Sequence, residues 1–324
     1  MHQLMSHTLA PSTHRQYDRC IKHYLEFCRR LNLHAFPLSE HNLMLHATHL
    51  SKHSSYSNIK THLSAIKYFD IKHGYHKQLP PLPRLYMLIR SIKRTLGNSR
   101  KKIKRQPITI LSLTKIHEKL LSSAYNQHDR QMIWSACTTA FFGFLRSSEY
   151  LAPTTKTFDA NSTLLFQDIT LSPSQIHISI KASKTDPFRN GCIVRLSTTQ
   201  HQICPVTILK QYLNMHTNKS GPLFTFTDGS FLTRRRLNTF LKSVEFQDHR
   251  SPVSSHSFRI GAATTAAAAG IPSWLIKSLG RWNSNCFATY VRIPDSTIAK
   301  TSRLIVNTKK LGEVWDPDTA WITL

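Results

Sequence analysis

The stretch Ser255-His256-Ser257-Phe258-Arg259-Ile260-Gly261, followed by Gly280-Arg281-Trp282 and Tyr290, decides how this chain is interpreted. His256 and Arg259 are three residues apart, so a helix that begins here presents both side chains on one face. The first turn of a helix also offers free backbone N–H groups and a favourable dipole for an anion. The stretch therefore predicts an anion-binding helix start, with a tyrosine shortly downstream.

The composition supports an acidic polymer as the partner. The 324 residues include 43 Lys and Arg against 17 Asp and Glu, a formal net charge of +26. Such an excess favours nucleic acid, and double-stranded DNA is the partner we expect. No membrane association is expected, because no run approaches the roughly 20 apolar residues of a spanning helix. The N-terminal residues lack an apolar signal core, which predicts an intracellular protein.

Cysteines and histidines give weaker signals. The six cysteines include no C-x-x-C pair, so the sequence predicts neither a disulfide framework nor a zinc ribbon, and mostly buried thiols. His46, His49 and His53 could share one helix face with metal-like spacing. No Asp, Glu or Cys partner lies nearby, so we interpret them as a polar face that meets DNA and expect no metal and no cofactor.

Residues 1–97 predict a domain of four helices, from apolar residues at helical spacing and from their capping residues. The first apolar stripe comprises Tyr17, Cys20, Ile21, Tyr24, Leu25, Cys28 and Leu31. The predicted boundaries are Ser12 or Thr13 as the first cap, Ser39 as the second, Ser57 to Gly74 for the third helix, and Pro83 to Gly97 for the fourth. Such a set can bury a small core and leave its basic side chains outside.

Basic residues concentrate in this first third of the chain. Residues 1–106 hold 19 Lys and Arg but four Asp and Glu, too few acids for an ordinary mixed surface. Residues 98–106 predict a basic linker that could follow a DNA backbone or serve as a nuclear targeting signal. The candidate phosphate contacts are Lys60, Lys67, Arg90, Lys93 and Arg94 in the helices and Arg100, Lys101, Lys102, Lys104 and Arg105 in the linker.

Residues 107–324 predict a second domain in which helices dominate and a few strands pair. The segment from Met132 to Phe144 is apolar nearly all round, as in a central buried helix. Strands are expected at 164–166, 175–180 and 192–196, with Lys184 in the turn between the last two. Helices are expected at about 112–124, 127–143, 205–214, 233–246, 255–269, 272–279 and 285–293. The fold class is therefore mainly α with a small antiparallel β-sheet.

These residues supply the groups that breaking and rejoining a phosphodiester needs. Tyr290 could attack phosphorus, provided that cations nearby favour its phenolate. Arg146 and Arg259 could each hold two phosphate oxygens with a planar guanidinium. His256 lies beside Arg259, and Lys184 could give a proton to the leaving 5′ oxygen. With no acidic cluster in the sequence, these cations would replace a metal ion.

The order of these motifs resembles the tyrosine recombinases, the phage-integrase-like family. The motifs are Arg146-Ser147-Ser148-Glu149 for the R-x-x-E motif, Ser183-Lys184-Thr185-Asp186 for the β-hairpin lysine, His256-Ser257-Phe258-Arg259 for the H-x-x-R box, and Tyr290 for the nucleophile. The resemblance implies a SAM-like core-binding domain at 1–97, an α+β catalytic domain at 107–324, and a supporting role for Glu149. It also implies a 3′-phosphotyrosyl intermediate and a homo-tetramer on DNA.

One position departs from the family pattern. Members usually carry His or Trp directly after the glycine of this motif, whereas Arg281 follows Gly280 here and Trp282 comes next. The Gly280-Arg281-Trp282 variant with Tyr290-Val291-Arg292 is most similar to recombinases of eukaryotic DIRS-like elements and Cryptons, which implies a mobile-element enzyme acting in a nucleus. Either Arg281 or Trp282 could fill the position.

Two alternative functions remain open from the sequence. A type IB topoisomerase resembles the family in its chemistry but relaxes DNA without exchanging strands, and a domesticated element protein could bind DNA without cutting it. The tail after residue 293, with Ile298, Leu304, Ile305, Trp315 and Trp321, could pack on its own chain or on a neighbouring protomer.

Overall fold

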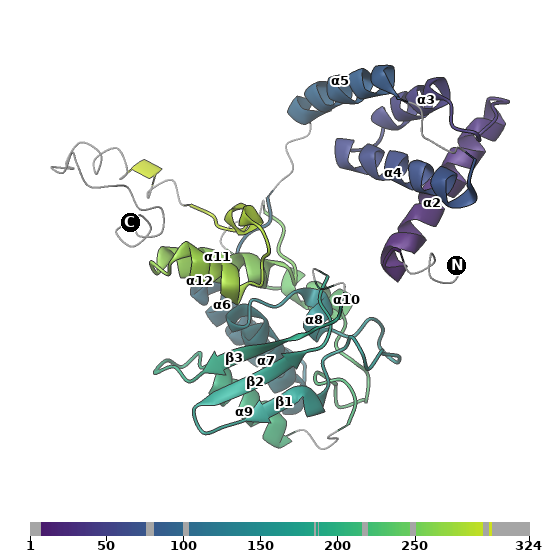
Figure 1. Ribbon diagram of the computed structural model, residues 1–324. Coiled ribbons are helices and arrows are strands. Elements are labelled where there is room, and N and C mark those ends of the chain that lie inside the picture. Colours follow the sequence, from purple (N-terminus) through teal and green to yellow (C-terminus); the bar gives the residue numbers. More distant parts are fainter. Residues whose placement is uncertain are drawn as a thin grey trace. The chain divides into compact units, whose positions relative to one another are not determined.

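The computed structural model describes residues 8–75, 81–99, 104–184, 186, 188–215, 220–246, 251–293 and 298–299 (Figure 1). The chain divides into two compact units, residues 1–102 and 103–324. None of the described helices combines the length and apolar character that crossing a bilayer requires.

Four helices form the described part of the first unit: α2 (Pro11–Arg30), α3 (Glu40–Ser51), α4 (Tyr56–His73) and α5 (Pro83–Ser99). Ser39 occupies the N-cap of α3, as predicted. The hydroxyl of Ser55 caps α4 by accepting a hydrogen bond from the Asn58 N–H. Helix α4 ends at Gly74, where φ is +68°, a conformation that glycine adopts without strain. Apolar side chains from all four helices form one core.

Three details of the first unit differ from expectation. Helix α2 begins at Pro11 after Ala10, because proline suits the first helical position, where no N–H partner is needed. The buried stripe of α2 is narrower than predicted, since Leu25 and Leu31 are 42% and 51% exposed. Helix α5 continues through Gly97 to Ser99, so this glycine does not end it.

The interpretation of His46, His49 and His53 as one polar face is wrong for His46. His49 and His53 are exposed, whereas His46 is fully buried. Its ring packs edge-on against the rings of Tyr24 and Phe27 from α2. Helix α3 is short and lies against its neighbours, so its buried face includes this position.

The second unit is built around α7. This unit contains α6 (Ile110–Leu121), α7 (Gln127–Phe142), α8 (Ser147–Tyr150), α9 (Pro205–Met215), α10 (Arg234–Lys242), α11 (Ser257–Ala268), α12 (Ser273–Leu279) and two 3-10 helices, η1 (Phe166–Asp168) and η2 (Asn285–Thr289). Residues Met132 to Phe141 of α7 are all buried, which confirms the central helix predicted from the sequence. Helix α7 packs against α6, α9 and α11 (Figure 1).

A three-stranded antiparallel sheet completes the second unit. Its order is β1 (Ile169–Leu171), β2 (Gln175–Ile180) and β3 (Cys192–Ser197). Alternate residues of β2 are buried, as predicted, and Ile176 and Ile178 lie opposite Leu196 and Val194 of β3.

The strand expected at 164–166 is displaced to β1. Leu164 and Leu165 are buried, but Leu165 makes only an isolated bridge, to Pro222. The Asp168 carboxylate accepts a hydrogen bond from the Leu165 N–H at 2.8 Å. This contact favours the 3-10 turn η1, which begins at Phe166, over an extended strand.

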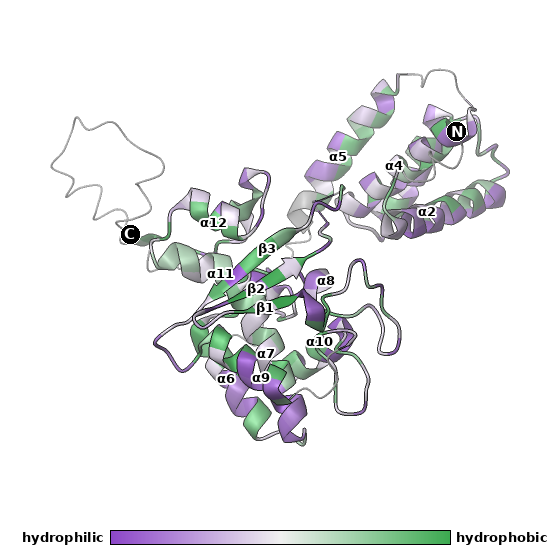
Figure 2. Cartoon of the chain, turned by 60° about the horizontal axis from the view of Figure 1, so that its bottom comes forward, coloured by the Kyte–Doolittle hydropathy of each residue, from purple (hydrophilic) through white to green (hydrophobic). Residues whose placement is uncertain are grey.

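Helix α11 packs very closely against the backbone at Ile108, in the segment before α6. The Ile108 N–H donates a hydrogen bond to the Ser257 carbonyl at 3.1 Å. A Cβ atom on Gly261 would come within 1.7 Å of the Ile108 carbonyl oxygen, so only glycine permits this approach. In Figure 2, α11 is coloured from white to green, the hydrophobic end of the scale, whereas α2 carries many purple, hydrophilic residues. The close packing fixes the start of α11, where His256 and Arg259 lie.

The cysteines lie largely as expected. Cys20, Cys28, Cys137 and Cys204 are buried, Cys192 is half-buried and Cys286 is exposed. All six are free thiols.

Candidate active site

Arg146, His256, Arg259 and Tyr290 come together from separate segments of the second unit. Arg146 lies between α7 and α8, His256 precedes α11, and Tyr290 ends η2. Arg259 is fully buried in α11, and its two terminal nitrogens donate hydrogen bonds to the carbonyl oxygens of Phe144 and Gly280. Arg259 thus joins the segment before Arg146 to the segment before Tyr290.

Glu149 anchors two of the arginines. Its carboxylate is buried and accepts hydrogen bonds from the Arg146 guanidinium at 2.9 Å and from the Arg281 guanidinium at 2.6 Å. The Arg146 backbone N–H adds a third, at 2.8 Å. Burial alone would raise the pKa of Glu149, but Arg281 and Arg146 together hold it below the ordinary value. The carboxylate therefore stays ionised and fixes both guanidinium groups.

Arg281 belongs to this network. It follows α12 with a φ of +56°, the left-handed region, which is unusual for a residue with a side chain. Its guanidinium also donates to the carbonyl oxygens of Gly143 and Phe144, at 3.2 and 3.4 Å. Arg281 therefore ties the α12 end to the segment that carries Arg146.

Trp282 plays a different part. Its buried ring lies 5.0 Å from the Tyr290 ring, measured between centroids, and 4.2 Å from the Arg259 guanidinium carbon. The ring folds back over Gly280, where an added Cβ would come within 1.6 Å of it. Glycine is thus required at this position. Arg281 and Trp282 thus meet the site in different ways, the first as an ion-pair donor to Glu149 and the second as a packing surface for Tyr290 and Arg259.

Tyr290 is half-buried beside His256, with the two ring centroids 5.4 Å apart and the rings edge-on. Its backbone carbonyl accepts a hydrogen bond from the Thr264 hydroxyl of α11 at 3.3 Å. The helix expected at 285–293 is shorter in the structure. Only Asn285–Thr289 is helical, as the 3-10 turn η2, because the chain after Tyr290 turns to meet Thr264, which accepts from the Arg292 N–H at 3.1 Å.

Burial and neighbouring positive charges lower the pKa of both His256 and Arg259. Burial, with the positive charges of Arg105 and Arg259, lowers the pKa of His256 to about 4. Burial, with Arg146 and Arg281 nearby, lowers the pKa of Arg259 to about 10. At neutral pH His256 is therefore a neutral imidazole, while Arg259 remains charged.

Lys184 is not brought into this cluster. It is exposed in the connection between β2 and β3, and it forms no hydrogen bond or ion pair with any residue that the structure describes. The preceding residue does reach the site: the Ser183 hydroxyl accepts a hydrogen bond from Arg146 at 2.7 Å. The strand connection is thus anchored at Ser183, one residue away from the lysine.

Sequence reasoning missed three residues near the site. Ser183 belongs to the lysine motif, but no sequence signal separates it from other serines. Arg105 lies in the predicted linker, yet its charge acts on His256, as does that of Arg234 at the start of α10. The run Arg234-Arg235-Arg236 is a basic cluster that could have been noticed. The positive field around His256 is therefore broader than the motifs alone indicate.

The five candidate DNA contacts on the helices of the first unit are exposed. Lys60 and Lys67 are seven residues apart on α4, which puts them on one face. Arg90, Lys93 and Arg94 lie on α5. Of the predicted linker contacts, Lys104 and Arg105 are exposed, whereas Arg100, Lys101 and Lys102 lie outside the described residues.

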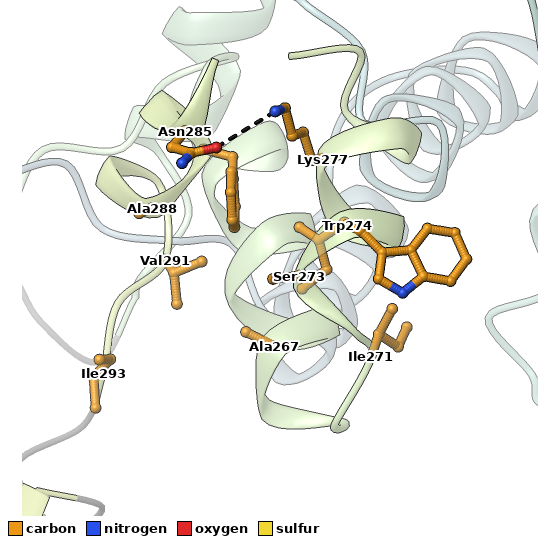
Figure 3. Close-up of a pocket in the computed structure, with 11 residues that line it drawn as sticks. Ala267, Ile271, Ser273, Trp274, Lys277, Asn285, Ala288, Val291 and Ile293 are labelled. Atoms are coloured by element: carbon orange, nitrogen blue, oxygen red, sulfur yellow. Dashed lines mark hydrogen bonds between the residues drawn. The ribbon is translucent and has the colours of Figure 1, made fainter. Parts of the chain in front are cut away.

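An apolar pocket of about 510 Å³ lies next to the Tyr290 segment (Figure 3). It is formed by the end of α11, by α12, and by the chain from η2 to Ile293. Ala267, Ile271, Phe287, Val291 and Ile293 contribute apolar walls, and Lys277 donates a hydrogen bond to Asn285 at its rim (Figure 3).

Comparison with known proteins shows similarity at the level of structure. No family model matches the chain, and no curated protein matches its sequence. A lambda integrase dimer bound to a COC′ core site aligns with a TM-score of 0.60 and 14% identity, over 96% of this chain and 95% of that chain. The XerH site-specific recombinase bound to palindromic difH substrate, in a post-cleavage complex, aligns with a TM-score of 0.59 and 17% identity, over 89% of this chain and 77% of that chain.

A third solved structure is similar over the same extent. The Tn1549 transposon integrase in complex with transposon right end DNA aligns with a TM-score of 0.56 and 14% identity, over 92% of this chain and 95% of that chain. At these identities the likeness establishes the fold. The mainly helical chain with its three-stranded antiparallel sheet has the tyrosine recombinase fold, as the sequence motifs predicted.

Proposed function

We propose that this chain is a site-specific DNA recombinase that cleaves and rejoins DNA through a 3′-phosphotyrosyl intermediate. The observation that carries the proposal is the position of Tyr290, with its ring centroid 5.4 Å from that of His256 and 5.8 Å from the Arg259 guanidinium carbon. A nucleophile surrounded by cationic and neutral donors suits attack on a phosphodiester. The similar solved structures, which include DNA-bound recombinases and integrases, support the same activity.

In the proposed reaction, the Tyr290 phenolate oxygen attacks phosphorus and the bond from phosphorus to the 5′ oxygen breaks. The phenol gives up its proton, and the leaving 5′ oxygen takes one to become a hydroxyl. Rejoining reverses the step, with a 5′ hydroxyl of the same or an exchanged strand as the nucleophile. The phosphodiester count is unchanged, so no external energy source is required.

Each side chain has a proposed part in this step. Arg146 and Arg259 would stabilise the negative charge that builds on the non-bridging oxygens. His256, a neutral imidazole at neutral pH, would accept the phenol proton or donate to a phosphate oxygen. Lys184, exposed on its strand connection, would approach with DNA bound and protonate the leaving oxygen. Glu149 and Arg281 would hold Arg146 in place.

The site requires a movement before phosphate can meet Arg259. Arg259 is fully buried against the Trp282 and Tyr290 rings, and its Nε has no hydrogen-bond partner among the described residues. A buried donor without a partner is unfavourable, so a phosphate oxygen placed there would satisfy it. We infer that the half-buried Tyr290 ring swings outward when DNA binds.

DNA would be held by the basic surface of the first unit and by Lys104, Arg105 and Arg234 of the second. Binding through such contacts falls steeply as salt concentration rises, because each neutralised phosphate releases counterions. The sequence variant around Gly280 and Tyr290 supports an origin in a eukaryotic mobile element, and the basic cluster near residue 102 would then direct nuclear entry.

Assembly into a homo-tetramer on DNA is part of the proposal. The apolar pocket beside η2 faces the segment in which the chain leaves Tyr290, and the tail contains further apolar residues. We infer that the tail of a neighbouring protomer fills this pocket. Removal of residues 301–324 would then leave DNA binding by one protomer intact and abolish higher complexes in native gels. Unchanged complexes would contradict this part.

The test of the activity uses nicked suicide substrates, in which the cut end diffuses away and the covalent complex accumulates. Because the target site is unknown, a pool of duplexes with randomised sequence next to the nick is incubated with the full chain, and the products are separated by denaturing electrophoresis. Wild type should form a covalent protein–DNA adduct, Tyr290→Phe none, and the control Tyr125→Phe the wild-type amount.

Other outcomes would contradict the proposal in distinguishable ways. Adduct formation by Tyr290→Phe would exclude this nucleophile. Relaxation of supercoiled plasmid without sequence preference would favour a type IB topoisomerase. Binding without cleavage, with a steep salt dependence and indifference to Tyr290→Phe, would favour a non-catalytic DNA-binding protein.

A further inference from the structure

Three histidines of the first unit converge from three helices. His23 comes from α2, His46 from α3 and His62 from α4. One ring nitrogen of each lies within 4.8 Å of those of the other two. The ring centroids are 5.3 to 5.6 Å apart for all three pairs. The chain between them spans 40 residues, so the cluster is created by the fold and not by a sequence motif.

Two of these rings are buried without the hydrogen bonds that buried imidazoles normally have. His46 is fully buried, and neither its Nδ1 nor its Nε2 has a hydrogen-bond partner among the described residues. His62 is 8% exposed, and its Nδ1 likewise has none there. A neutral imidazole carries one N–H donor and one acceptor nitrogen, and buried polar groups are nearly always satisfied. Packing against Tyr24 and Phe27 accounts for the burial of His46 but gives its nitrogens nothing to bind.

The geometry matches what a metal ion requires. Imidazole nitrogens bound tetrahedrally to zinc at about 2.0–2.1 Å lie about 3.4 Å from one another, with ring centres about 5 Å apart. The observed ring spacing is already close to this, so small side-chain rotations would bring the nitrogens into place.

We propose that His23, His46 and His62 bind one divalent transition-metal ion, zinc in the first instance, inside the helical unit. Three histidines leave a fourth position for water, on the exposed side where His23 lies. The ion would cross-link α2, α3 and α4. Helix α4 also carries Lys60 and Lys67, so the ion would fix the helix that presents these two candidate DNA contacts.

This site is independent of the proposed DNA cleavage, because none of its residues belongs to the second unit. Its test therefore reads metal binding alone. The full chain is prepared without an affinity tag, since a polyhistidine tag would bind the same ions, and is stripped with a chelator. Zinc binding is then measured by competition with a chromophoric chelator, and cobalt is added in parallel because tetrahedral Co²⁺ has an intense visible absorption.

Wild type should bind one zinc ion per chain tightly enough to compete, and its cobalt form should show the tetrahedral spectrum. His23→Gln is the first variant, since its side chain is exposed and its loss should not unfold the core. It should weaken zinc binding by more than about tenfold and abolish the cobalt spectrum. His62→Gln should do the same. The matched control is His53→Gln, an exposed histidine of the same unit outside the cluster.

The proposal is overturned if wild type binds no zinc in competition with the chelator. It is equally overturned if His23→Gln and His62→Gln bind as tightly as wild type, or if His53→Gln weakens binding as much as they do. Tighter binding of copper or nickel than of zinc would also support the site. Nitrogen ligands generally bind divalent ions more tightly from nickel to copper and less tightly again at zinc.

Discussion

Each unit of this chain contains a cluster of basic side chains that are buried in whole or in part. The two clusters differ in whether the side-chain nitrogens have hydrogen-bond partners. In the second unit, the guanidinium groups of Arg146, Arg259 and Arg281 are matched by the Glu149 carboxylate and by backbone carbonyl oxygens. In the first unit, the imidazoles of His46 and His62 have nitrogens with no hydrogen-bond partner in the part of the chain that the structure describes.

Proton chemistry explains the difference. An arginine stays charged when buried, so the fold must supply an anion and acceptors or lose stability. A histidine can lose its charge, and burial then leaves a neutral ring able to bind a metal ion. One cluster is therefore complete within the protein, apart from the Nε atoms of Arg259 and Arg281. The other would be completed by the proposed metal ion.

Glu149→Gln is the strongest way to break the matched cluster. The side chain is fully buried between two guanidinium groups, and removing one partner of a buried ion pair typically costs about 3–5 kcal/mol. We expect a loss of this size in the free energy of unfolding of the second unit. All five tryptophans lie in this unit, so urea unfolding followed by tryptophan fluorescence reports on it alone.

The matched control is Glu118→Gln, which changes an exposed carboxylate on α6. It should shift the unfolding midpoint very little. An equal shift for both variants would contradict the role given to Glu149.

Arg281→Met should cost less, since it keeps much of the side-chain volume while removing the charge. Glu149 loses one of its two ion pairs but retains Arg146, and two carbonyl oxygens lose a donor. We expect a cost of about 1–3 kcal/mol from the acceptors that lose this donor, although the Phe144 carbonyl oxygen keeps its hydrogen bond from Arg259. In the same fluorescence assay, Arg281→Met should therefore fall between wild type and Glu149→Gln. A variant as stable as wild type would show that Arg281 is not part of the cluster.

Some parts of this site can be predicted from the sequence and others cannot. The order and spacing of His256, Arg259 and Tyr290 are sufficient to predict that the three lie close together in the fold. The joint role of Arg281 and Trp282 was not predictable, since it depends on a left-handed turn at Arg281 and on the room that Gly280 leaves for a ring.

The first unit also contains features that the sequence predicts and features that it does not. The four helices follow from their apolar stripes and, for α3 and α4, from Ser39 and Gly74, whereas the boundaries expected at Ser12 or Thr13 and at Gly97 differ in the structure. The histidine cluster does not, because His23, His46 and His62 meet only when three helices pack. The local spacing of His46, His49 and His53 suggested a different grouping, which the structure does not form.

Gly280→Ala should disturb the second unit through one contact. The added Cβ would overlap the Trp282 ring, which must then move away from Tyr290 and Arg259. Overpacking of this kind costs about 1–3 kcal/mol. A double-mutant cycle with Trp282→Leu checks the cause: the cost of Gly280→Ala should shrink once the large ring is gone. The same cost in both backgrounds would place the strain elsewhere.

The smallest expected effect concerns pH. Because the pKa of His256 is lowered to about 4 in the folded chain, the unfolded chain binds more protons between that pH and about 6.5. The contribution of the neutral His256 ring to the free energy of unfolding is therefore fully present above about pH 6.5 and is lost as the pH falls from there toward about 4. Between pH 7 and pH 5.5 the loss should be about 1 kcal/mol or less, because solvent screens a partly exposed ring.

His256→Gln should remove this part of the pH dependence. Urea unfolding at pH 7 and pH 5.5, followed by tryptophan fluorescence, compares the two proteins. An unchanged slope with pH in the variant would mean that His256 is not held neutral by its neighbours.

The most direct test of the central claim is to identify the residue that becomes joined to DNA. Trypsin cleaves after Arg281 and after Arg292, and the peptide between them contains Tyr290 as its only tyrosine. After trapping on the nicked duplex pool and digestion with nuclease and trypsin, mass spectrometry should find a nucleotide on this peptide. The released DNA fragment should carry a free 5′ hydroxyl. A nucleotide on any other peptide, or a 5′ phosphate on the released fragment, would contradict the assignment of Tyr290 as the nucleophile.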